Sequence, residues 1–121
     1  MSEIKRLHVG KCYCEVTIYK DVVYLAGQVP RHCASEQSSD IVTQAQDVFS
    51  QIDALLVEAG SDKHRILSCQ IFLADMADYA GFNQAWRDWV SPSNPPPRAT
   101  VQAQLANPDW KLEIVITAAI Y

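Results

Sequence analysis

A single arginine, Arg98, has both the side chain and the setting to bind an anion. It follows three consecutive prolines, Pro95 to Pro97, and opens a segment of strand-like composition at 98–105. Proline fixes φ and disfavours helix in the residue before it, so the chain enters this segment in an extended form. The guanidinium is planar with paired donors, which suits a carboxylate or a phosphate. On position alone, a surface arginine at a strand end explains the same pattern.

A second candidate, Glu113, lies fifteen residues after Arg98 in a segment that alternates apolar and other residues. A carboxylate near an anion-binding arginine can accept hydrogen bonds from a polar ligand. The chain offers no plausible Ser-His or Cys-His pair, so the pattern does not indicate a nucleophilic mechanism. By itself, Glu113 is better explained as a lone carboxylate on a solvated strand face.

Length and charge limit the possible functions. The 121 residues are expected to form one domain, over 1–121, with a sizeable core. The formal net charge of −4 shows no basic footprint for nucleic acid or for an anionic membrane. No apolar run approaches the roughly 20 residues that span a bilayer, and no apolar signal core follows the first residues. We therefore expect a soluble, cytoplasmic protein that binds neither nucleic acid nor membrane.

The metal-binding residue types do not form a recognisable site. Cys12 and Cys14 make a C-x-C pair rather than the spacing of structural zinc sites, and no second pair follows. The other cysteines are Cys33 and Cys69, and the three histidines show no ligand spacing. In a cytoplasmic protein the expected state of the thiols is reduced and free. The spacing of these residues therefore predicts no metal site.

Hydrophobic periodicity predicts the elements that would position these residues. Segments 13–20 and 22–27 are rich in β-branched and aromatic residues and predict a hairpin around Lys20-Asp21. Apolar residues then recur at helical spacing over 41–56, after possible caps at 38–40 and before a stop at Gly60. A third strand is expected at 65–73.

The second half of the chain repeats this alternation. A second helix is expected from Met76 or Asp78 to Val90, and its aromatic stripe has the spacing that docks a helix on a sheet. Segments 98–105 and 111–120 predict a second hairpin around 107–109. The expected order is β-β-α-β-α-β-β, an α+β fold with both helices on one face of the sheet. The other face must be solvated or covered by another chain.

Strand alternation assigns residues to these two faces. In the last strand the face under the helices takes Leu112, Ile114, Ile116, Ala118 and Ile120. In the preceding strand the same reasoning assigns Ala99, Val101, Ala103 and Leu105 to the core, and Arg98, Thr100, Gln102 and Gln104 to the open face. The sequence therefore predicts Arg98 and Glu113 on one open, semi-polar face.

Four segments of the chain together resemble the reactive intermediate deaminase family, the YjgF-like Rid proteins. The segments are Tyr24–Pro30, Ile52–Gly60 leading into Ile66–Leu73, Asp75–Asn83, and Pro96–Arg98 with Leu112–Ile114. They follow the family's order and span nearly the whole chain. The most specific part is a Pro-x-Arg followed fifteen residues later by glutamate.

The resemblance implies a chorismate-mutase-like α+β fold and a homotrimer whose sheets form an inner barrel, with sites in the clefts between subunits. The implied reaction is hydrolysis of a reactive imine or enamine acid, such as 2-aminoacrylate or 2-iminopropanoate, to a 2-oxo acid and ammonia. No metal or cofactor is implied. The partner would be this small carboxylic acid.

The resemblance also assigns roles to individual residues of this chain. Arg98 matches the arginine that clamps the substrate carboxylate, and Glu113 matches the glutamate that positions or activates water. Four further positions match substrate-binding residues of the family, namely Tyr13, Gly27, Asn83 and Thr100. Thr100 stands where many members have cysteine, and Ala26 stands where many have serine. The hydroxyl that Ala26 lacks is expected to affect which substrates bind more than which reaction is catalysed.

Three other functions remain open from the sequence. A non-catalytic module that binds small carboxylates such as 2-oxo acids needs Arg98 but not Glu113. Translation inhibition or RNA cleavage, attributed to some relatives, is disfavoured by the net charge of −4 and the lack of a basic stripe. A purely structural trimer predicts that loss of Arg98 changes only stability.

Overall fold

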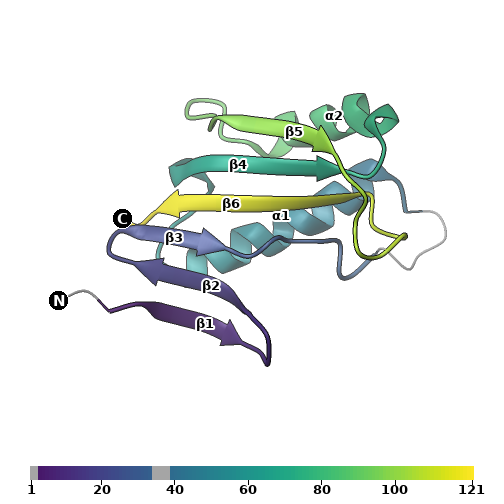
Figure 1. Cartoon of the computed structure of the whole chain (residues 1–121). Coiled ribbons are helices and arrows are strands. Elements are labelled where there is room, and N and C mark those ends of the chain that lie inside the picture. Colours follow the sequence, from purple (N-terminus) through teal and green to yellow (C-terminus); the bar gives the residue numbers. More distant parts are fainter. Residues whose placement is uncertain (1–2, 34–38) are drawn as a thin grey trace.

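The computed structural model describes residues 3–33 and 39–121, and it contains one curved sheet with helices against one face (Figure 1). The six strands run in the spatial order β1-β2-β3-β6-β4-β5. Their bounds are Lys5–Val9 (β1), Cys14–Tyr19 (β2), Val22–Leu25 (β3), Ile66–Leu73 (β4), Arg98–Gln102 (β5) and Leu112–Ala119 (β6). The long helices are α1, Ile41–Glu58, and α2, Tyr79–Trp89, and the short 3₁₀ turns are Lys63–Arg65 and Met76–Asp78. The predicted α+β class with both helices on one face is confirmed.

The first hairpin forms as predicted, and the structure adds a strand in front of it. Strands β2 and β3 pair antiparallel around a turn in which Lys20 has φ 55°. The additional strand, β1, pairs antiparallel with β2 and forms one edge of the sheet. Its residues are almost all exposed. A short, charged edge strand lacks the apolar alternation by which a buried strand is recognised.

The predicted second hairpin is wrong. Strand β5 pairs in parallel with β4, with Cys69 opposite Arg98, and β6 lies between β3 and β4. The chain after β5 therefore crosses the end of β4 before it returns as the central strand. Turn residues at 107–109 favour a reversal of the chain, but they do not decide which strand the returning segment joins.

This pairing also reverses the predicted faces of β5. Arg98, Thr100 and Gln102 stand opposite Cys69, Ile71 and Leu73, which are buried on the helix-covered face. Residues opposite one another in a ladder share a face, so Arg98 and Thr100 point toward the helices. Val101, predicted in the core, is 45% exposed on the other face. The prediction for β6 is confirmed for Leu112, Ile114, Ile116 and Ala118, which are all fully buried.

Helix α1 begins and ends at the residues that the sequence indicated. The Asp40 carboxylate accepts a hydrogen bond from the Thr43 amide, which satisfies one of the free donors of the first turn. Of the other two possible caps, Ser38 lies outside the described residues. At the other end Gly60 has φ 90°, a conformation that glycine adopts without steric cost, and the chain turns toward β4.

The two helices meet through an aromatic cluster. The Phe49 ring of α1 stacks on Trp89 at 4.3 Å and packs near Phe82 and Trp86 at 6.0 and 6.2 Å. The Trp89 indole N–H donates to both carboxylate oxygens of Asp53 at 3.0 and 3.1 Å, so its polar atom is satisfied. Phe82, Trp86 and Trp89 of the predicted aromatic stripe are therefore part of the core, whereas Tyr79, the first residue of the stripe, is 41% exposed.

We expect the change Phe49→Ala to lower the free energy of unfolding by about 3–5 kcal/mol, because it removes the ring that three other aromatic residues contact. Urea unfolding followed by tryptophan fluorescence measures this loss. The control is Val57→Ala on the same helix, where the side chain is 67% exposed and the change should stay within about 0.5 kcal/mol. Equal losses in the two variants would contradict the central place of Phe49.

Candidate functional site

Arg98 lies on the helix-covered face, against aromatic rings of α2. The three prolines deliver it to the start of β5, where the Cys69 amide donates to the Pro97 carbonyl at 3.1 Å. Its guanidinium carbon is 5.0 Å from the ring centre of Trp86, 5.6 Å from Phe82 and 6.0 Å from Tyr79. Rings at these distances attract a cation and hold the guanidinium in place. The aromatic residues of α2 thus pack in the core and also contact the guanidinium of Arg98.

The charge of Arg98 has no anionic partner within the described part of the chain. Its Nη2 donates a short hydrogen bond to the Asn83 side-chain oxygen, while Nη1 is buried and bonded to nothing. The Thr100 hydroxyl oxygen is also buried without a hydrogen bond. A half-buried cation with a free donor is costly unless an acceptor reaches it. Three of the six predicted site residues, Arg98, Asn83 and Thr100, therefore form one group with unused hydrogen-bonding capacity.

Glu113 and Gly27 form a second group. A Cβ atom added to Gly27 would lie 2.1 Å from Glu113 Oε2, so the carboxylate occupies the space that any side chain there would need. The neighbouring residues are bonded to each other, since the Gln28 amide donates to the Ile114 carbonyl at 2.8 Å and the Ile114 amide donates back at 3.0 Å. This bridge between the β3–α1 segment and β6 fixes Gly27 against the carboxylate.

The two groups lie on opposite faces of the sheet within one chain, and the prediction that Arg98 and Glu113 share the open face is wrong. Arg98 is level with Cys69 and, through it, with Ile116, whereas Glu113 is opposite Phe72 on the open face. They are three residues apart along the strands, about 10 Å, and two strands apart, again about 10 Å. A single copy of the chain does not bring these two residues together.

Tyr13 belongs to neither group in one chain. It lies in the turn between β1 and β2, where its carbonyl accepts from the Gly10 amide at 2.8 Å. Its side chain is 63% exposed. Strand β2 and the Arg98-bearing β5 are separated by three other strands. Any joint role of Tyr13 and Arg98 therefore needs a second copy of the chain.

Sequence reasoning missed a polar network behind Gly27. Glu15 is only 9% exposed and Gln28 only 1%. Arg31 Nη2 donates to Glu15 Oε2 at 2.5 Å, and Gln28 Nε2 donates to the Ala26 carbonyl at 3.0 Å. In a regular β2, Glu15 would face away from the core because its neighbour Val16 faces it, so alternation gave no signal for this network.

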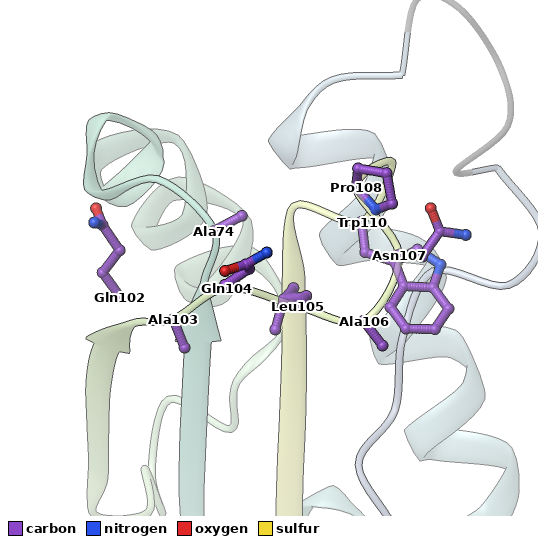
Figure 2. Close-up of a pocket in the computed structure, with 9 residues that line it drawn as sticks. All are labelled: Ala74, Gln102, Ala103, Gln104, Leu105, Ala106, Asn107, Pro108 and Trp110. Carbon is purple, nitrogen blue, oxygen red and sulfur yellow. The ribbon is translucent and has the colours of Figure 1, made fainter.

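A separate hollow lies away from both groups. It measures about 510 Å³ and lies where β5 ends and β6 begins, with Gln102, Asn107 and Trp110 in its lining (Figure 2). It contains none of the six predicted site residues and no charged side chain. We therefore do not place the site there. In 3–33 and 39–121, no cluster of His, Cys, Asp and Glu could hold a metal ion, and no helix has the length and apolarity to cross a membrane.

Burial next to Arg98 changes the acidity of one cysteine. Desolvation raises the pKa of the Cys69 thiol to about 12, although the nearby positive charge of Arg98 opposes the shift. Cys69 is the cysteine that stands opposite Arg98 in the ladder. Cys69 is therefore a neutral, apolar neighbour of Arg98 rather than a thiolate that pairs with it.

Known proteins resemble this chain over nearly its whole length, in sequence and in structure. The sequence model of the family described as Endoribonuclease L-PSP matches residues 3–120. A "RutC family protein" of Haemophilus ducreyi is 50% identical over 97% of both chains. The crystal structure of a YjgF family member from Neisseria meningitidis superposes with a TM-score of 0.91 at 39% identity, covering 98% of this chain and 96% of that one. The "3-aminoacrylate deaminase RutC" of Acinetobacter baylyi is 30% identical over 89% of this chain and 86% of its own length.

These likenesses bear on the fold as well. YjgF proteins have the chorismate-mutase-like fold, and the two helices on a mixed six-stranded sheet agree with it. The fold class that the sequence resemblance implied is therefore confirmed. Four of the described features, namely the central β6, the edge β5, the aromatic face of α2 and the Gly27 contact, determine where the candidate residues stand.

We expect the change Gly27→Ala to lower the free energy of unfolding by about 0.5–1.5 kcal/mol, because the new methyl group forces the flexible Glu113 side chain out of its present rotamer. In the background Glu113→Ala the same glycine change should cost little, since the overlapping atoms are gone. A double-mutant cycle in urea measures the coupling. If Gly27→Ala lowers the free energy of unfolding equally with and without the Glu113 side chain, Gly27 and Glu113 are not in contact.

We also expect the stability to depend on Cys69 at alkaline pH. The folded thiol keeps its proton up to about pH 12, whereas the unfolded thiol loses its proton from about pH 9 upward. Between these pH values the unfolded state binds fewer protons than the folded state. The contribution of Cys69 to the free energy of unfolding is therefore fully present below pH 9 and falls by about 1.4 kcal/mol per pH unit above it. Urea unfolding between these pH values should show this slope to be smaller in Cys69→Ala, and Cys12→Ala at an exposed position is the control. Parallel pH profiles of wild type and Cys69→Ala would contradict the burial of the thiol.

Proposed function

The chain belongs to the Rid family of YjgF-like proteins, and from this premise we propose that it hydrolyses reactive 2-imino and enamine acids to 2-oxo acids and ammonia. The proposed substrate class includes 2-aminoacrylate and 2-iminopropanoate. The observation that carries the proposal is the buried, unbonded Nη1 of Arg98, a cation without an anion. The name of the Acinetobacter baylyi relative, 3-aminoacrylate deaminase, contains an enamine acid of similar size and supports this class.

The proposed role of Arg98 is to bind the substrate carboxylate. The two terminal nitrogens have different partners. Nη2 donates to Asn83, and Nη1 has no partner and would donate to the substrate carboxylate. The aromatic rings beside it exclude water and strengthen a charge-assisted hydrogen bond. The Thr100 hydroxyl, also without a partner, lies two residues further along the same face and would bond a second polar atom of the substrate.

The proposed role of Glu113 is to position and deprotonate water. The water oxygen bonds to the imine carbon as its proton passes to the carboxylate, and the electron pair of the C=N double bond goes to the nitrogen, which takes up a proton. The carbinolamine hydroxyl then passes its proton through the carboxylate to the nitrogen. The oxygen forms the C=O bond of the 2-oxo acid as the C–N bond breaks, and its electron pair leaves with ammonia. A positioned base of this kind contributes about 10²–10⁴-fold, and the fixed carboxylate contributes through orientation.

The proposed site is shared between copies in a homotrimer. One copy keeps the Arg98 group and the Glu113 group on opposite faces, so an Arg98 group would meet the Glu113 group of a neighbouring copy. The open sheet face carries exposed apolar side chains, including Tyr24 at 47%, Leu67 at 48% and Val101 at 45%. Apolar exposure of this kind favours contact with another chain, in agreement with an inner barrel of three sheets. The exposed Tyr13 would contribute to the same cleft.

A second candidate is a non-catalytic module that binds small carboxylates such as 2-oxo acids. The observation that favours it is the placement of Arg98, Asn83 and Thr100 in one group that needs no second copy. Ala26, which lacks the hydroxyl found in many family members, fits this function equally well. Glu113 distinguishes the two candidates, because a binding module would keep its affinity without it.

The family description also names endoribonucleases. A ribonuclease needs a basic surface that neutralises phosphates, and the 14 acidic residues of this chain outnumber the 10 lysines and arginines. The charge balance therefore favours a small carboxylate over RNA as the ligand.

The test generates 2-aminoacrylate from serine with a dehydratase and follows pyruvate while semicarbazide competes for the imine. We expect wild type to preserve pyruvate formation and Arg98→Ala to lose at least about 100-fold in rate, because the carboxylate clamp is removed. Glu113→Gln should lose about 10²–10⁴-fold while retaining affinity for 2-oxo acids. The matched control is Arg87→Ala, an exposed arginine on α2, which should act like wild type.

The outcomes separate the candidates. Activity in wild type that survives in Arg98→Ala would remove Arg98 from the site. No activity in wild type, together with pyruvate binding that Arg98→Ala abolishes and Glu113→Gln leaves intact, would replace the deaminase by the binding module.

A further inference from the structure

A groove separate from the proposed site lies between the first two strands and helix α1. It encloses about 410 Å³, within the range of small-molecule sites. Its floor contains Glu15 and Gln28, and its helical wall presents Gln51, Leu55 and Glu58. None of the six predicted site residues lines it. We call it the α1 groove.

A local distortion of the first hairpin turns two polar side chains into this groove. His8 has φ 56°, and the register passes from the pair Leu7–Val16 to the pair Val9–Cys14 without pairing His8 to Glu15. Alternation would place both side chains on the open face, because Leu7 and Val16 face the core. Instead His8 Nε2 lies 2.7 Å from Glu58 Oε1 on α1. A non-glycine residue at positive φ is strained, which indicates that surrounding contacts maintain this arrangement.

The floor of the groove contains the buried carboxylate of Glu15, whose lost hydration is only partly replaced by hydrogen bonds. Arg31 Nη2 donates to Glu15 Oε2 at 2.5 Å, while the hydrogen bond from Gln28 Nε2 to Glu15 Oε1 is long, at 3.4 Å. A carboxylate that is 9% exposed has lost most of its water and gains from a further donor. Oε1 is the oxygen with capacity left.

Gln51 adds an acceptor that has no hydrogen-bond partner. Its Nε2 donates to the Val29 carbonyl at 2.9 Å and to Asp47 Oδ1 at 3.1 Å, and both partners are acceptors. The amide is therefore oriented with the nitrogen toward them, and Oε1 remains. This Oε1 is buried and has no partner. A buried carbonyl without a donor costs about 1–3 kcal/mol, which a ligand N–H would recover.

Within the described residues, Gln51 Oε1 is the buried side-chain atom of the groove that has no hydrogen-bond partner, and it is an acceptor. The net charge of the groove is negative. With both histidines neutral, Glu15 and Glu58 contribute two negative charges and Arg31 one positive charge, so the sum is one unit negative. Ala54 and Leu55 supply an apolar wall between the polar ends. We propose that the α1 groove is a second binding site, for a small primary ammonium compound with a short alkyl body, whose N–H groups bond Glu15 and Gln51.

The groove is connected to the Glu113 group through residues 26–28. Gln28 bonds Glu15 by its side chain and Ile114 by its backbone, and Gly27 lies between Gln28 and Ala26. The Ala26 amide also donates to the Glu15 carbonyl at 2.9 Å. A ligand that draws on the Glu15 carboxylate therefore acts on the segment that holds Gly27 against Glu113, and it modulates whatever reaction Glu113 serves.

The test titrates ¹⁵N-labelled full-length protein with n-butylammonium chloride at about pH 8, where histidine is neutral. Tetramethylammonium chloride at equal concentration is the matched control ligand, because it has the same charge and no N–H group. We expect n-butylammonium, and not the control, to shift the side-chain amide resonances of Gln28 and Gln51 and the backbone amide of Gly27. This readout does not depend on the deaminase proposal.

Three variants locate the site. Glu15→Gln should weaken binding about tenfold, since it removes a charge-assisted hydrogen bond. Glu58→Gln, a milder change at a side chain that is 47% exposed, should weaken it about threefold and guards against misfolding of the first variant. Asp109→Asn removes an equal charge from an exposed position in the β5–β6 loop and should bind as wild type does.

Equal shifts with both cations, or equal binding by Asp109→Asn and both glutamate variants, would reduce the effect to general charge and overturn the site. Shifts produced by sodium acetate in place of n-butylammonium would overturn the ligand class. Saturable shifts in Gln51 that leave Gly27 unmoved would overturn the connection to Glu113.

Discussion

The central position of β6 governs the rest of the structure. This strand pairs with β3 on one side and β4 on the other, and its inward residues Leu112, Ile114 and Ile116 are fully buried under the helices. With β6 in the centre, the residue that follows Gly27 meets Ile114 and brings the glycine against Glu113. Because β6 takes the inner side of β4, only the outer side is left for β5. One pairing choice thus sets the position of both candidate groups.

The edge position of β5 explains the setting of Arg98. On this edge, the helix-covered face of the sheet borders α2, and the guanidinium meets Trp86 and Phe82 rather than solvent. The same rings pack on Phe49 of α1, so the stability of the helix pair and the orientation of the cation share one cluster. Contacts of this kind contribute about 0.5–2 kcal/mol each. Arg98 is therefore held by the core while its charge stays available.

One buried polar network lies at the first hairpin and the segment that follows it. Glu15, Gln28 and Arg31 form a continuous hydrogen-bonded group beneath α1, and Gln28 joins it to the backbone of β6. A buried polar network specifies a unique arrangement, because every alternative leaves a donor or acceptor unpaired. In this protein the network supports the backbone next to Glu113 from the helix side, whereas the carboxylate itself faces the open side of the sheet.

Local sequence patterns predicted both long helices and every strand except β1, and they singled out Arg98 and Glu113 as candidates. Helix α1 was readable from its period and from Asp40 and Gly60, and the buried face of β6 was readable from alternation, because burial repeats every two residues in a strand. The pairing of strands was not readable, since turn residues at 107–109 indicate a reversal and not a partner. Only the tertiary structure decided that β5 joins β4, that Arg98 faces α2, and that Arg98 and Glu113 lie on opposite faces. The physical reason is that long-range pairing minimises the exposed apolar area of the whole sheet, a quantity that no local segment contains.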